Sequence, residues 1–223
     1  MENILYRPIE KRDYETIKDI ICHAFFLDQY MEDKRLLEAV KSQYLYNCLL
    51  EATYTCVAEK NGTIVGVIMG NAKKDYHMFY HIPYLTKLFW YMLKLFWHAK
   101  KQKDQAAGYQ RLQKIYHQFY NRHKGEFDGV LTLFAVNADC RGLGIGKNLM
   151  KRCMTYLKRK QVHRIYLYTD TTCTYEVYEH WGFKRLEEAP LQMKRLGKAF
   201  HMDIFLYGYS FHSEKKKDRR KEA

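Results

Sequence analysis

The chain has 223 residues, of which 47% are hydrophobic, and it carries a formal net charge of +13. This length and composition predict a folded domain with a buried core and exclude a wholly disordered chain. A basic surface favours anionic partners in general and does not choose among nucleic acid, acidic lipid and a phosphorylated cofactor. The first residues lack the apolar segment of a secretory signal, and the six cysteines are scattered without metal-like spacing. We therefore expect free thiols, no metal site and a cytoplasmic location.

The first part of the chain predicts a strand, two helices and a hairpin. A short strand is expected at 4–9, followed by a helix from Asp13, which is placed to cap it, and by a second helix over 32–52. Asn61-Gly62 then separates two β-branched runs, and this pair of residues is a strong hairpin signal.

Residues 71–127 differ in character from the rest. They hold eleven Lys or Arg against three Asp or Glu, which gives +8. Aromatic residues crowd the stretch 76–98, but Pro83 and Lys87 interrupt it, so we expect no transmembrane segment. A helix beginning near Pro83 would be amphipathic, and a further helix is expected over 104–123. The broad apolar side of the helix that begins near Pro83 is expected to pack against the domain or a sister subunit, with a role at a membrane surface as the alternative. That side consists of Leu85, Leu88, Phe89, Met92, Leu95 and Phe96, and a ridge of Lys87, Tyr91, Lys94, His98 and Lys101 lies beside it.

The second part of the chain predicts a β-α-β unit. Strands are expected at 129–136 and 165–169, with a helix over 145–159 between them, and this succession implies a parallel strand pair. A short helix ending at Gly182 precedes the last two strands. The final residues, 213–223, predict a basic flexible tail.

The turn between the strand and the helix of that unit is the most informative stretch. Gly142, Gly144 and Gly146 alternate along it and let the backbone pass close to a ligand with its N–H groups turned the same way. The helix that follows adds the donors of its first turn and the positive end of its dipole. A pyrophosphate is the natural occupant, and Arg141 and Lys147 add positive charge.

Two well-known glycine patterns do not fit this turn. A Walker A loop needs glycine at the position of Arg141 and Ser or Thr at the position of Asn148. A dinucleotide fingerprint needs glycine where Lys147 stands.

The residues from Val136 to Met150 read V-x-x-x-x-R-G-x-G-I-G-x-x-L-M, and this run resembles the acyl-CoA motif of the GCN5-related N-acetyltransferase (GNAT) family. Downstream, Tyr178 to Phe183 resembles the Y-x-x-x-G-F element of the same family. A looser similarity links the chain to the puromycin-acetyltransferase-like branch, which often has a long helical insertion before the fourth strand and a T-x-x-x-x-N-x-x-x-Y run. Thr169 and Tyr178 match that run, while Thr174 stands where the branch often has Asn, and its aromatic pair at the start of the fourth strand is absent here.

The resemblance implies an α/β fold: a mixed, mostly antiparallel twisted sheet with a central parallel strand pair and flanking helices. It implies a single acetyltransferase domain over 1–212, with residues 71–127 as a basic, aromatic-rich helical insertion. It also implies acetyl-CoA as cosubstrate and transfer of the acetyl group to the primary amine of a small acceptor by direct attack in a ternary complex. The insertion is expected to form one wall of the acceptor pocket or a homodimer contact.

The resemblance also assigns roles to residues. The backbone N–H of Val136 is expected to stabilise the oxyanion, Tyr178 to act as general acid, and Phe134 and Val136 to pair with the pantetheine amides. The remaining cofactor-binding residues are expected to be Arg141, Gly142, Leu143, Gly144, Ile145, Gly146, Lys147 and Thr174, together with Tyr178. No general base is assigned: Glu126, Asp128, His163 and His180 are the candidates for that role, and the sequence favours none of them.

Two other classes of function remain open at the level of the sequence. One is a non-catalytic acyl-CoA-binding or interaction protein, in which Tyr178→Phe would alter nothing measurable. The other is nucleic-acid or membrane-surface binding through the basic insertion, which would show steep salt dependence. Nucleic-acid binding is not expected, because basic stripes are usually solvated faces.

Overall fold

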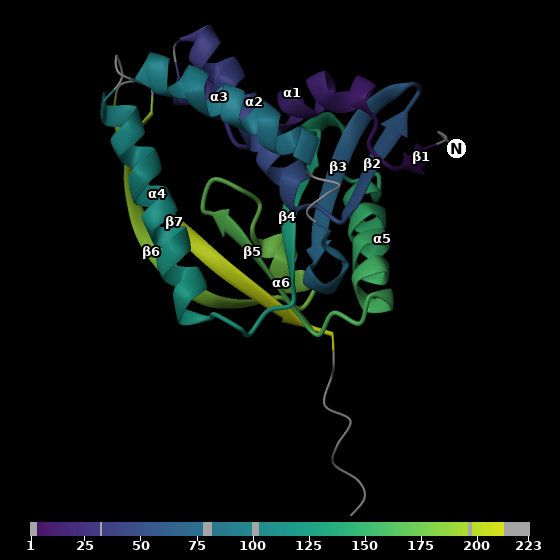
Figure 1. Cartoon of the computed structure of the whole chain (residues 1–223). Helices are drawn as coiled ribbons and strands as arrows, with labels where there is room; N and C mark the ends of the chain where they lie inside the picture. The colour runs from purple at the N-terminus through teal and green to yellow at the C-terminus, as the bar shows by residue number, and fades with distance from the viewer. Residues whose placement is uncertain (1–3, 32, 78–81, 100–102, 196–197, 212–223) are drawn as a thin grey trace, which may run out of the picture.

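A computed structural model describes residues 4–31, 33–77, 82–99, 103–195 and 198–211. Its described strands form one seven-stranded sheet of order β1-β2-β3-β4-β5-β7-β6 (Figure 1). The strands are β1 (Ile4–Arg7), β2 (Tyr54–Lys60), β3 (Thr63–Ala72), β4 (Gly129–Val136), β5 (Arg164–Asp170), β6 (Lys184–Arg195) and β7 (Lys198–Ser210). The pair β4–β5 is parallel and the other neighbours are antiparallel, which confirms the predicted sheet.

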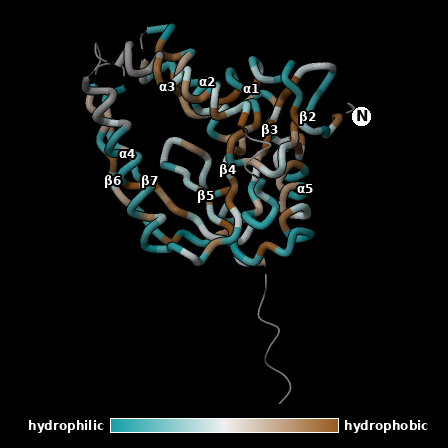
Figure 2. The backbone as a smooth tube through the Cα atoms, in the orientation of Figure 1, coloured by the Kyte–Doolittle hydropathy of each residue, from teal (hydrophilic) through white to brown (hydrophobic). Residues whose placement is uncertain are grey.

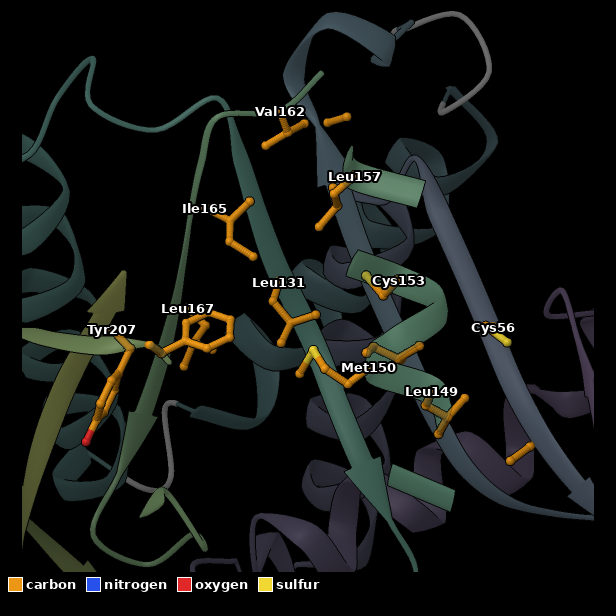
Figure 3. Close-up of a cluster of buried hydrophobic side chains, with 14 of the residues drawn as sticks. Cys56, Leu131, Leu149, Met150, Cys153, Leu157, Val162, Ile165, Leu167 and Tyr207 are labelled. Atoms are coloured by element: carbon orange, nitrogen blue, oxygen red, sulfur yellow. The ribbon is translucent and has the colours of Figure 1, made fainter. Parts of the chain in front are cut away.

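Helices cover both faces of this sheet (Figure 1). They are α1 (Tyr14–Ala24), α2 (Lys34–Glu51), α3 (Ile82–Ala99), α4 (Lys103–Arg122), α5 (Ile145–Arg159) and α6 (Glu176–His180). α5 packs on one face through Leu149, Cys153 and Leu157 (Figure 3), while α1 and α2 pack on the other through side chains such as Ile17 and Leu45. α4 lies along β6 and β7, where Phe119 is fully buried. The apolar residues of the central strands, brown in Figure 2, therefore lie between two helical layers.

The hairpin between β2 and β3 forms as predicted. Asn61 and Gly62 both have a positive φ, at 51° and 78°, as a two-residue turn of this kind requires. The six cysteines are all described and none forms a disulfide, as predicted.

The prediction that Asp13 caps the first helix is wrong. Its carboxylate makes no capping hydrogen bond to α1. It accepts instead two hydrogen bonds from the Arg7 guanidinium, at 2.7 and 2.8 Å, and one from the amide of Glu10. Arg7 also donates to Glu59 on β2, at 2.8 Å. The carboxylate therefore ties the start of α1 to the edge of the sheet.

The segment predicted as an insertion contains the end of β3 followed by α3 and α4. α3 rests on α2 through Tyr84 and Tyr91, whose rings contact Tyr46 with centroids 6.3 and 5.5 Å apart. The sequence predicts that its apolar side packs against the domain or a sister subunit. Leu85, Phe89 and Met92 are exposed, so packing against the domain is wrong for them, and the contact with a sister subunit stays a prediction. Among the helices that the structure describes, none has the length and apolar content needed to cross a membrane. The predicted tail, 213–223, lies outside the described residues.

Candidate active site

The site begins where β4 and β5 part. These strands pair only through Gly129 with Ile165 and Val130 with Tyr166, and beyond that point they diverge (Figure 3). The rest of β4 keeps its partner on the other side, β3. The edge of β4 that faces β5 is therefore left without a strand partner along most of its length.

The backbone of Val136 faces this opening. The amide of the next residue, Asn137, donates to Val65 of β3 at 2.9 Å. Successive residues of a strand turn their amides to opposite edges, so the amides of Val136 and Phe134 point away from β3 and toward the gap. These are the two positions at which the sequence predicts pantetheine pairing.

The glycine turn follows directly and leads into α5. Gly142 and Gly144 have φ values of +80° and +72°, in the left-handed region that side chains disfavour. At Gly146 the constraint is different, since a Cβ there would lie 3.2 Å from Cζ of Phe134, a tight contact that the ring would have to relieve by a small shift. The turn itself is exposed to solvent, including the side chain of Leu143, whereas Ile145 is buried beneath it.

The amides of this turn are available to a ligand. Within the described chain, the amide of Arg141 donates to Ala138, while the amides of residues 142–147 donate to no protein acceptor. The next amide, that of Asn148, closes the first bond of the helix onto Gly144. A row of free N–H groups at the positive end of a helix dipole, beside the exposed Arg141 and Lys147, suits a doubly charged diphosphate. The geometry therefore fits the phosphate part of a coenzyme A molecule.

Tyr178 lies at the inner side of this opening, on α6. Its ring contacts Phe134 and Trp181 edge-on, each with centroids 6.4 Å apart. No described residue forms a hydrogen bond with its hydroxyl. The hydroxyl is not fully enclosed by protein either, and Tyr178 lines the cavity, so the hydroxyl faces the cavity. Burial raises the pKa of Tyr178 above its ordinary value, and the nearby Cys173 and Asp170 shift it the same way. The hydroxyl therefore holds its proton at neutral pH.

An open cavity of about 580 Å³ joins these features. It is lined by every predicted site residue except Leu143, including Thr174 after β5. Its far wall comes from residues that the sequence did not single out: His23, Phe25 and Phe26 at the end of α1, Tyr44 on α2, and Tyr168 on β5. Phe26 adopts a positive φ of 52°, rare for an aromatic residue. A local motif gives no signal for this wall, because three separate elements build it.

The acidic residues weighed as bases lie elsewhere. Glu126 and Asp128 sit just before β4, at the closed end of the β4–β5 pair, and neither lines the cavity. Burial alone would raise the pKa of both carboxyls. Hydrogen bonds outweigh this effect of burial and lower both pKa values. Glu126 accepts them from the side chains of His123 and Arg164, and Asp128 accepts them from the backbone amides of Arg164 and His163. Their contacts hold the strand ends together.

The two candidate histidines, His163 and His180, also form their contacts away from the cavity. The ring of His163 contacts Asp128 at 2.9 Å, and that of His180 contacts the backbone carbonyl of Glu176 at 2.8 Å. None of the four candidate bases therefore faces the opening.

Together, a splayed parallel pair, an unpaired strand edge and a row of free amides at a helix N-terminus define an acyl-CoA-dependent transferase. Comparison of the chain with known protein families agrees with this class. The model of the acetyltransferase (GNAT) family matches residues 71–183. The chain therefore belongs to this family. It is an N-acetyltransferase, and acetyl-CoA is its cosubstrate.

Solved structures show the same fold at low sequence identity. PH1933 from Pyrococcus horikoshii OT3 has 15% identity and a TM-score of 0.60, with 95% of this chain and 100% of that chain covered. A ribosomal-protein-alanine N-acetyltransferase from Brucella melitensis has 15% identity and a TM-score of 0.53, with 93% of this chain and 99% of that chain covered. The protein yncA from Salmonella typhimurium, solved with its cofactor acetyl-CoA, has 14% identity and a TM-score of 0.53, covering 97% and 98%. Among curated proteins, no sequence match is found. The finer resemblance to the puromycin-acetyltransferase-like branch stays a prediction.

Proposed function

We propose that the chain moves the acetyl group of acetyl-CoA to the primary amine of a small acceptor with an apolar body. The single observation that carries this is the row of unpaired amides at residues 142–147, which continues the free edge of β4. The pyrophosphate binds these amides with help from Arg141 and Lys147, and the pantetheine arm pairs with Phe134 and Val136. Thr174 lies on the cavity wall beside the arm.

The reaction then needs three groups from the chain. The neutral amine attacks the thioester carbonyl carbon in a ternary complex, and the amide of Val136 donates to the oxygen as it becomes negative. The C–N bond forms and the C–S bond breaks. The hydroxyl of Tyr178 gives its proton to the departing sulfur, which a raised pKa allows because the proton is still present at neutral pH.

His23 is the proposed acceptor of the proton that the amine must lose. It lies in the cavity wall at the end of α1, and histidine is the side chain best suited to take a proton near neutral pH. The only other ionisable nitrogens in the described lining are those of Arg141 and Lys147, which are assigned to the pyrophosphate.

The lining also bears on the acceptor. No Asp or Glu belongs to it among the described residues, while Phe25, Phe26, Tyr44 and Tyr168 do. A polyamine carries several positive charges, and its recognition needs carboxylates. An amine attached to an aromatic or aliphatic body needs only apolar contact around a single nitrogen. The cavity therefore favours an arylalkylamine or an aminonucleoside over a polyamine.

A thiol-release assay with acetyl-CoA and a panel of amines tests this function. We expect turnover with amines that have apolar bodies and little with spermidine or lysine. A non-catalytic acyl-CoA-binding protein would bind acetyl-CoA and release no thiol with any amine. Preferential turnover of polyamines would contradict the acceptor assignment and leave the donor site standing.

We further propose that residues 1–212 form one acetyltransferase domain in which the segment 71–127 is an insertion. α4 packs on β6 and β7 through a buried hydrophobic cluster that includes Phe119 and Leu191. This packing supports treating the inserted helices as part of that domain.

A further inference from the structure

Exposed apolar side chains gather on α3. Of the eight large hydrophobic residues that are exposed in the described chain, six belong to this helix. They include Phe89 and Trp90, with 66% and 62% of their surface exposed. The full set is Ile82, Leu85, Phe89, Trp90, Met92 and Leu93. Single exposed apolar residues are ordinary, but a contiguous group of this size marks a surface with a partner.

These six residues share one side of the helix. At 100° per residue they fall within a single arc, and Tyr84 and Tyr91 fall on the opposite side. The two tyrosines hold α3 against Tyr46 of α2. α3 lies at the periphery of the molecule, next to α2 (Figure 1). Because the tyrosines face α2 and the six apolar residues are exposed, the apolar side of the helix is turned away from α2.

The charge along the segment that holds this helix is of one sign. From Tyr76 to Lys103 the sequence has five lysines and no Asp or Glu. Lys87, which is exposed, lies next to the apolar arc on the helix. A helix with an apolar aromatic face and Lys87 at its border, in a segment whose charges are all positive, matches the headgroup region of an anionic bilayer, where Trp and Tyr are favoured and lysine meets phosphate.

We propose that α3 lies flat on an anionic phospholipid bilayer, with Phe89, Trp90 and their apolar neighbours inserted among the lipids and the lysines at the headgroups. A second copy of the chain that met this face with its own α3 fits less well, because residues 76–103 would bring the same lysines and contain no carboxylate to pair with them. Lysine is also depleted in protein interfaces. Nucleic acid would satisfy the lysines and leave the apolar residues in water.

Co-sedimentation of the full chain with vesicles tests the proposal. Vesicles of phosphatidylcholine alone are compared with vesicles containing about 30% phosphatidylserine, at low and high salt. We expect strong binding to the anionic vesicles, weaker binding to the neutral ones, and a decrease with salt. Phe89→Ser/Trp90→Ser should weaken anionic binding by about tenfold or more, because it removes the inserted rings without changing charge.

Two matched controls separate the contributions. Leu5→Ser removes another large exposed apolar residue, on β1, and should leave vesicle binding unchanged. Lys87→Gln should weaken anionic binding by roughly fivefold, while Lys158→Gln, which removes an exposed charge from α5, should change it much less. Thermal unfolding and acetyl-CoA affinity of each variant show that the fold and the donor site are intact.

Several results would overturn the proposal. One is equal binding of the wild type and Phe89→Ser/Trp90→Ser to anionic vesicles. Another is binding that ignores both lipid charge and salt. A third is a wild-type dimer that ignores vesicles and becomes monomeric in Phe89→Ser/Trp90→Ser, since α3 would then be a contact between copies. None of these results depends on whether the chain acetylates amines.

Discussion

Replacing Gly144 by alanine should weaken acetyl-CoA binding much more than it weakens the fold. Gly144 lies at the start of α5 with φ at +72°, and a Cβ built on it meets nothing within 4 Å. Gly62 in the β2–β3 turn has nearly the same backbone, with φ at +78° and equally open space. It therefore provides a matched control at a site remote from the cavity.

The cost to stability should be the same at both positions. Because alanine meets no steric clash at either position, the cost comes only from holding an L-residue in the left-handed region. That cost is about 1–2 kcal/mol. In a chain of this length, that lowers the melting temperature by about 2–8 °C. Binding should differ, because even a small shift of the strained backbone at Gly144 turns amides of residues 142–147 away from the ligand, whereas the same shift at Gly62 affects no ligand. Losing one charge-assisted hydrogen bond costs about 1.5–3 kcal/mol, and therefore about tenfold or more in Kd.

Isothermal titration of acetyl-CoA into both variants, with melting curves alongside, makes the comparison. The expected pattern is a similar fall in melting temperature for Gly144→Ala and Gly62→Ala, with a loss of affinity in Gly144→Ala only. If Gly144→Ala melts like Gly62→Ala and still binds acetyl-CoA with wild-type affinity, the amides of the turn are not the pyrophosphate site.

Three further perturbations address the chemistry and the fold. Tyr178→Phe should lower kcat about 100-fold with little change in acetyl-CoA affinity, and an unchanged kcat would exclude Tyr178 as the acid. His23→Gln should lower kcat/KM at neutral pH and recover at alkaline pH, where the amine is already neutral; a profile parallel to wild type would exclude His23 as the base. Arg7→Met should lower the free energy of unfolding in urea by about 3–5 kcal/mol, because it leaves the buried Asp13 carboxylate unpaired.

The Arg7–Asp13 pair also carries a pH dependence. The hydrogen bonds from Arg7 lower the pKa of Asp13 below its ordinary value, despite burial. The stabilisation from this pair is therefore complete above the ordinary carboxyl pKa and is lost as the pH falls through the lowered one. Unfolding curves should show the wild type and Arg7→Met converging in acid. A constant gap between them down to the lowest pH would contradict this account.

The donor half of the site could be predicted because local sequence determines it. Gly142 and Gly144 are needed for their positive φ, and the strand and helix on either side follow from periodicity. The error at Asp13 has the opposite cause. A carboxylate before a helix is a good cap by local rules, but here the guanidinium of Arg7, at the end of β1, binds it with two hydrogen bonds instead. A contact between elements therefore overrides a local preference.

α3 shows the same limit in another form. Hydrophobic periodicity predicts that a helix has an apolar side, and it does not reveal what covers that side. Tyr84 and Tyr91 hold the helix to α2, while Phe89 and its neighbours remain exposed. The outcome depends on where α2 lies, which no residue of α3 encodes.

The two halves of the cavity therefore differ in how they can change. The donor half is one continuous segment from β4 to the start of α5, so that the free strand edge and the free amides keep a fixed spacing along the chain. The acceptor half is assembled from separate elements: His23 and Phe25 at the end of α1, Tyr44 on α2, and Tyr168 on β5. Substitutions there can reshape the acceptor pocket without moving the donor site. Tyr44→Ala should consequently change KM for the amine while the Kd for acetyl-CoA stays at its wild-type value, and a parallel change in both constants would show that the halves are coupled.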